Sequence, residues 1–124
     1  MYVKMIKSYD EFSGEMDIIV TDGKFDILCY YWPIYSSKLK VGDQISKIST
    51  CGADNIMTEL NEEPDVKKTD ESYYSYDLIG KIINIEESLI SIGELIIKLD
   101  GYLPGDIQLG DIVKLSIDRM DAYV

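Results

Sequence analysis

The chain has 124 residues, of which 46% are hydrophobic, and its formal net charge at pH 7 is −11. This length predicts one globular domain with its own core, and the negative charge disfavours partners that carry a phosphate backbone or anionic lipid. Histidine is absent, which excludes Ser-His-Asp and Cys-His catalysis and imidazole metal sites.

The first half of the chain predicts four strands, each a short run with alternating apolar residues. Phe25, Ile27 and Cys29 share one face of the run at residues 24–32. The dipeptide Asp22-Gly23, which favours tight hairpins, separates this run from the one before it. We expect the four strands at residues 2–7, 16–22, 24–32 and 43–51.

The middle of the chain predicts the one helix. Ile56 and Leu60 stand four residues apart on one helical face, after Asp54, a suitable N-cap. A helix is therefore predicted at residues 53–63. The polar, aperiodic segment 64–72 that follows is expected to be an exposed loop.

The second half predicts three further strands, at residues 74–86, 89–100 and 111–118. The second of these has the clearest alternation in the chain, with Leu95, Ile97 and Leu99 on one face. Gly80 and Gly93 interrupt the runs, and a glycine inside a strand is typical of a bulge. We therefore expect both glycines at bulges of long strands rather than in turns.

An apolar-Gly-Asp triplet occurs twice, at Val41-Gly42-Asp43 and at Leu109-Gly110-Asp111, each time before a strand. Turn chemistry explains both copies, because glycine accepts positive φ and a short aspartate side chain can bond nearby backbone groups. A second interpretation is a pseudo-repeat, with halves 1–51 and 73–124 joined by the acidic helix and loop of residues 52–72. We favour turn chemistry as the first explanation.

These elements predict a single all-β domain over residues 1–124. We expect a mainly antiparallel small barrel or sandwich of about seven strands with one short helix. The order of the elements between residues 16 and 100 is that of an OB-like five-stranded barrel. Two similar half-barrels packed face to face are the alternative arrangement.

Neither the cysteines nor the carboxylates form a recognisable metal or cofactor motif. Cys29 and Cys51 lie in predicted strands and are expected to be buried and reduced, although a disulfide between them stays open. Glycine-rich phosphate loops and EF-hand loops are absent. We expect no metal ion, no cofactor and no enzymatic activity. The densest carboxylate groups are interpreted as a solvated face (Glu59, Glu62, Glu63, Asp65) and as turn residues (Asp100, Asp106, Asp111).

Two aromatic clusters, at residues 30–35 and 73–76, supply the candidate binding residues. Buried rings would pack in the core or at a barrel rim, whereas exposed rings would be anchors at a protein interface. Stacking on nucleic-acid bases would also need surrounding cations, and few lysines lie near either cluster. The protein-binding candidates are Tyr30, Tyr31, Trp32, Tyr35, Tyr73, Tyr74 and Tyr76.

Charge and tyrosines together predict a non-enzymatic acidic binding protein that engages a basic protein partner. An immunity- or inhibitor-type protein is one instance, because a negative face mimics nucleic acid and accelerates encounter. The alternatives are an OB-like nucleic-acid-binding module and, third, a structural or assembly subunit that pairs through edge strands. A cytoplasmic location without membrane partners is expected, because neither a long apolar run nor the apolar core of a secretory signal is present.

Overall fold

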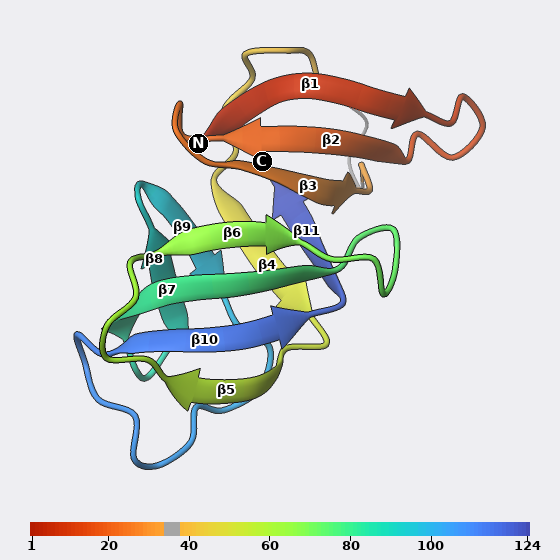
Figure 1. Cartoon of the computed structure of the whole chain (residues 1–124). Coiled ribbons are helices and arrows are strands. Elements are labelled where there is room, and N and C mark those ends of the chain that lie inside the picture. Colours follow the sequence, from red (N-terminus) through yellow and green to blue (C-terminus); the bar gives the residue numbers. More distant parts are fainter. Residues whose placement is uncertain (34–37) are drawn as a thin grey trace.

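A computed structural model of the chain describes residues 1–33 and 38–124, and eleven strands account for its regular structure (Figure 1). No residue in these two ranges is helical. The all-β prediction is confirmed, whereas the predicted seven strands and one helix are wrong. The strands are β1 (Tyr2–Tyr9), β2 (Met16–Thr21), β3 (Asp26–Tyr31), β4 (Lys47–Cys51), β5 (Asp54–Thr58), β6 (Asp65–Lys68), β7 (Tyr76–Asn84), β8 (Leu89–Ile92), β9 (Leu95–Lys98), β10 (Ile112–Ile117) and β11 (Arg119–Tyr123).

The strands form one open, mixed sheet and not the closed barrel that the element order predicted. The strand order is β1-β2-β3-β11-β4-β9-β8-β7-β10-β5, and β6 pairs with β7 beside this path. β11 pairs in parallel with β3, and β4 pairs in parallel with β9. The other pairs between described strands are antiparallel. In Figure 1, β1, β2 and β3 form one end of the molecule, and β5, β7 and β10 lie toward the other.

The same three-stranded arrangement occurs in both halves of the chain. β1, β2 and β3 are consecutive antiparallel neighbours, and so are β7, β8 and β9. Each half then adds a strand to the other half, because β4 pairs with β9 and β11 pairs with β3. This exchange joins the halves into one sheet. The matching cross-strand rows, all fully buried, are Val3-Val20-Ile27 and Ile82-Ile90-Ile97.

The two Gly-Asp segments are turns with the same hydrogen bonds, as turn chemistry predicts. The φ angle is 94° at Gly42 and 89° at Gly110. In each turn the aspartate N–H donates to the carbonyl three residues earlier, at 3.0 Å to Lys40 and 3.1 Å to Gln108. The aspartate carboxylate in turn accepts from the N–H of that same residue, at 2.9 and 2.8 Å. The repeated sequence therefore corresponds to a repeated local geometry.

The predicted helix at residues 53–63 is wrong, since this segment begins as β5, and β6 lies where an exposed loop was expected. β5 pairs antiparallel with β10, with Thr58 opposite Val113. The apolar residues that a helix here would carry are poorly buried in the structure, where Met57 is exposed and Leu60 is almost fully exposed. Short isolated helices are marginal in water, so the hydrogen bonds to β10 stabilise the extended form more.

Neither interior glycine lies at a bulge, contrary to the prediction. Gly93, with φ of 60°, lies in the turn between β8 and β9. The next residue, Glu94, fixes this turn by donating its N–H to the Asp22 carboxylate at 2.8 Å. Gly80 lies in an unbroken stretch of the β7–β10 ladder. Packing around it is tight, because a Cβ there would lie 3.0 Å from the Cδ1 atom of Ile90 and 3.2 Å from the Ser91 carbonyl oxygen.

The two cysteines differ in burial and are both free thiols. Cys29 is buried in β3, as expected, whereas Cys51 at the end of β4 is exposed. Burial raises the pKa of the Cys29 thiol, so this residue behaves as a small apolar member of the core.

Candidate functional site at the acidic aromatic end

The structure separates the candidate aromatic residues into core and surface groups. Tyr31 and Tyr76 are buried, and the Tyr76 hydroxyl accepts a hydrogen bond from the Leu28 N–H at 3.0 Å. These two rings therefore belong to core packing. Trp32 and Tyr73 expose 59% and 54% of their surface, so both are accessible to a partner.

The remaining candidates bring the two aromatic clusters together in space. Tyr30, in β3, and Tyr74, just before β7, are both half-buried, and their ring centroids lie 6.4 Å apart with planes at 84°. Tyr73 packs edge-on against Tyr74 at 4.9 Å. Edge-to-face contacts of this kind stabilise aromatic pairs beyond the area that they bury. Tyr35 lies outside the described residues.

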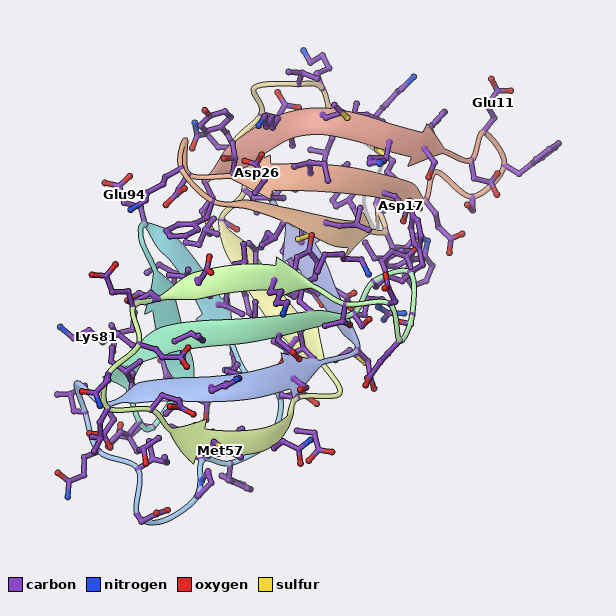
Figure 2. All side chains as sticks on the ribbon, viewed as in Figure 1. Glu11, Asp17, Asp26, Met57, Lys81 and Glu94 are labelled. Atoms are coloured by element: carbon purple, nitrogen blue, oxygen red, sulfur yellow. The ribbon has the colours of Figure 1, made fainter. Side chains whose placement is uncertain are left out.

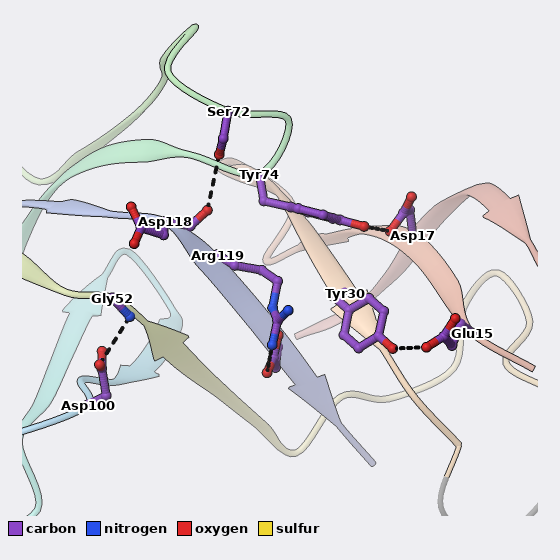
Figure 3. Close-up of polar contacts among 10 residues, drawn as sticks. Glu15, Asp17, Tyr30, Gly52, Ser72, Tyr74, Asp100, Asp118 and Arg119 are labelled. Atoms are coloured by element: carbon purple, nitrogen blue, oxygen red, sulfur yellow. Dashed lines mark hydrogen bonds and ion pairs between the residues drawn. The ribbon is translucent and has the colours of Figure 1, made fainter. Parts of the chain in front are cut away.

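Both half-buried tyrosines donate hydrogen bonds to carboxylates of the β1–β2 hairpin (Figure 3). The Tyr30 hydroxyl donates to Glu15 Oε1 at 2.5 Å, and the Tyr74 hydroxyl donates to Asp17 Oδ1 at 2.6 Å. Burial, and then these hydrogen bonds, raise the pKa of Tyr30 to about 12 and also raise the pKa of Tyr74. The phenols therefore stay protonated at neutral pH and hold the two carboxylates in fixed positions.

Arg119, the first residue of β11, packs over the Tyr30 ring. Its guanidinium carbon lies 4.9 Å from the ring centroid, a cation–π distance. The Nε and Nη2 atoms donate to the Asp121 carboxylate at 2.7 and 3.1 Å, and this pairing raises the pKa of Arg119. Arg119 therefore positions the tyrosine ring, while its charge is compensated by Asp121 rather than by Glu15.

The turn that ends the β1–β2 hairpin carries residues that sequence reasoning missed. Asp10 Oδ1 accepts hydrogen bonds from the N–H groups of Phe12 (2.8 Å) and Ser13 (3.4 Å). The Phe12 side chain is fully exposed, and Figure 2 shows Glu11 projecting from the same tip. The available signal was a large apolar residue inside a polar turn sequence, Asp10–Gly14.

A pocket of about 220 Å³ opens beside this hairpin turn. Three of its lining residues are carboxylates and three are tyrosines, and none of the described lining residues is basic. A lysine, Lys38, contacts one of the lining rings, with Nζ 4.3 Å from the Tyr9 ring centroid. We call the pocket, the turn and the adjacent rings the acidic aromatic end, which comprises Ser8, Tyr9, Asp10, Glu11, Phe12, Glu15, Met16, Asp17, Tyr30, Trp32, Tyr73 and Tyr74.

The other carboxylate groups singled out in the sequence have structural or solvated roles. Burial acts to raise the pKa of Asp100, but hydrogen bonds from the Thr50 hydroxyl and from the N–H groups of Ala53 and Gly52 together lower it. Asp111 closes its turn, as described above. Across residues 1–33 and 38–124, no group of three or more cysteine, aspartate and glutamate side chains could hold a metal ion.

No protein-family model, curated protein or solved structure matches this chain. The part of the chain that the structure describes contains no helix with the length and hydropathy that crossing a membrane requires. The geometry of the acidic aromatic end is therefore the basis for assigning a role.

Proposed function

We propose that the protein is a non-enzymatic binding protein whose acidic aromatic end engages a basic protein partner. The observation that supports the proposal most strongly is the pocket, where Asp10, Glu15 and Asp17 meet tyrosine rings without a lining cation among the described residues. Tyrosine and tryptophan are enriched at protein interfaces, and complementary charge steers encounter. The net charge of −11 also attracts a basic partner at longer range.

The local geometry supports binding by a surface that is organised in advance. Glu15 and Asp17 accept hydrogen bonds from Tyr30 and Tyr74, so these carboxylates lose little rotamer freedom when a cation approaches. Cations of the chain itself already lie on two of the rings, as Lys38 does on Tyr9. A lysine or arginine side chain of a partner would find the same combination of ring faces and carboxylate oxygens.

An immunity- or inhibitor-type protein in the cytoplasm is the specific form of this proposal. The basic partner of such an inhibitor would be a protein that binds nucleic acid. In the complex, the carboxylates of the inhibitor would occupy the positions of phosphate groups.

The test is the affinity of the full chain for the octapeptide (Arg-Ser)4, measured by calorimetry at about 20 mM and about 300 mM salt. Glu11→Lys is the site variant, and Glu86→Lys makes the same charge change in the exposed turn between β7 and β8. We expect Glu11→Lys to weaken low-salt binding about fivefold and Glu86→Lys to weaken it less than about twofold.

Two results would contradict the proposal: an affinity that does not fall with salt, or equal effects of the two variants. A single-stranded oligonucleotide at low salt is the control for the nucleic-acid-binding alternative. We expect this oligonucleotide not to bind, because the carboxylates of the acidic aromatic end repel its phosphate groups.

One observation favours the structural or assembly role as a second candidate. Among the described strands, β5 pairs only with β10 and β6 pairs only with β7, so each leaves one edge unpaired. Unpaired edges are templates for pairing with another chain. Light scattering at increasing protein concentration tests this role, since oligomers that grow with concentration support it and a monomer throughout contradicts it.

A further inference from the structure

Phe12 is a fully exposed aromatic ring at the tip of the β1–β2 hairpin. Its exposure is 103%, and Tyr102, at 99%, is the other large apolar side chain of the described residues that is completely exposed. Removing a ring of this size from water is favourable, so a partner that covers it gains affinity. Exposure alone does not distinguish Phe12 from Tyr102, so the choice of Phe12 as the binding residue depends on the groups near each ring.

The turn that carries Phe12 is organised by several hydrogen bonds. Asp10 accepts from the Phe12 N–H, and the Gly14 N–H donates to the Asp10 carbonyl at 2.8 Å. Ser13 and Glu15 exchange two further bonds, each of 3.1 Å. The backbone beneath the ring is therefore fixed before any partner arrives, which lowers the entropy lost on binding.

The hairpin turn that carries the ring has further groups suited to an interface near it. The turn packs against Pro33, since a Cβ on Gly14 would lie 2.8 Å from the proline Cγ. This contact places the exposed Trp32, the residue before Pro33, beside the hairpin turn. Asp10 and Glu11 immediately precede Phe12 in the chain, so the apolar ring lies in an anionic setting. A complementary surface must be apolar at its centre and cationic around it.

We infer that Phe12 is the apolar anchor of the acidic aromatic end, and that the partner presents apolar side chains flanked by lysine or arginine. This inference rests on the proposed function and adds the chemistry of the partner surface. Aromatic anchors at the centre of an interface, surrounded by polar contacts, provide a large share of binding energy. Charge on its own would attract any basic protein, whereas the ring selects basic surfaces that also have an apolar patch.

Tyr102 supplies the matched control for this anchor. It is equally exposed, but the nearby Asp100 carboxylate already accepts hydrogen bonds from the Thr50 hydroxyl and two backbone N–H groups. The loop of Tyr102 has one further exposed carboxylate, Asp106, whereas the turn of Phe12 adjoins the pocket that Asp10, Glu15 and Asp17 line. Phe12→Ala and Tyr102→Ala each remove one exposed ring without disturbing the core.

The experiment compares three octapeptides, (Arg-Leu)4, (Arg-Ser)4 and (Glu-Leu)4, by calorimetry with the full chain and both variants at low salt. We expect (Arg-Leu)4 to bind about fivefold to tenfold more tightly than (Arg-Ser)4. Phe12→Ala should abolish this difference, and Tyr102→Ala should preserve it. (Glu-Leu)4 should not bind.

The outcomes separate this inference from the proposed function. If both basic peptides bind equally, or if Phe12→Ala leaves the difference intact, the anchor role is wrong and the proposed function stands. If neither basic peptide binds, both are wrong. If (Glu-Leu)4 binds as well as (Arg-Leu)4, the surface recognises apolar peptides without regard to charge, and this also contradicts both.

Discussion

Replacement of Asp100 by asparagine should destabilise the fold without changing its shape. The carboxylate lies where the chain passes from β4 to β5, and it accepts from Thr50 Oγ1 (2.5 Å), Gly52 N (3.0 Å) and Ala53 N (3.0 Å). An asparagine side chain keeps one acceptor oxygen and replaces the other with an NH2 group. One backbone N–H, that of Gly52 in the present arrangement, then loses its acceptor and faces a donor.

The expected loss follows from the number and exposure of these bonds. Hydrogen bonds to a charged group contribute roughly 1.5–3 kcal/mol each, and exposure of the aspartate to water reduces that value. We expect Asp100→Asn to lower the free energy of unfolding by about 1–2 kcal/mol. With a urea m-value of about 2 kcal/mol/M, the midpoint of unfolding should fall by roughly 0.5–1 M.

The assay is urea unfolding at pH 7 and at lower pH, with Asp106→Asn as the control. Asp106 is exposed in a nearby loop, and its replacement should change the stability by less than about 0.5 kcal/mol. The pKa of Asp100 is lowered in the folded state, so its contribution is complete above the unfolded pKa of about 3.9. The contribution is lost as the pH falls through the folded pKa.

The difference between the wild type and Asp100→Asn should therefore shrink below about pH 4. A difference that stays constant down to pH 2 would refute the role of the charged acceptor. An equal effect of Asp106→Asn would refute the importance of the three donors.

Two further substitutions test the repeated turn and the packing of the tyrosines. Gly42→Ala and Gly110→Ala should each lower the free energy of unfolding by about 1 kcal/mol, because both residues have φ near 90° in matching turns. Gly105→Ala is the control and should leave the free energy of unfolding unchanged, because the φ angle of Gly105 is ordinary. A difference of more than about 1 kcal/mol between the first two would contradict the equivalence of the turns. Tyr76→Phe should lower the free energy of unfolding by about 1–3 kcal/mol, because the Leu28 N–H loses its hydrogen-bond acceptor. Hydrogen exchange of the Leu28 amide should accelerate, and an unchanged exchange rate would disprove this role of Tyr76.

Strands with strict alternation could be predicted from the sequence, because one face of each is buried. β2, β9 and β10 lie inside predicted runs, and their inward positions are isoleucine, valine and leucine in most cases. β5, β6 and β11 could not be predicted. β6 has a single apolar residue, Val66, and becomes a strand only because β7 supplies an unpaired edge.

The candidate site was predictable in its residue types but not in its geometry. The sequence indicated both aromatic clusters, yet alternation alone could not tell that Tyr76 enters the core while Tyr73 remains exposed. The contact between Tyr30 and Tyr74 depends on long-range strand exchange between the halves. Phe12 was missed because a single apolar residue in a turn has no periodicity by which to recognise it.

The most direct test of a basic-partner surface is to map where a basic peptide binds. Addition of (Arg-Ser)4 to the 15N-labelled full chain at low salt should shift the amide resonances of residues 9–17 and 73–75 most strongly. These segments contain the four carboxylates of the acidic aromatic end and four of its six rings. Shifts spread evenly over the many acidic residues, or concentrated in the turn between β7 and β8, would contradict the assignment.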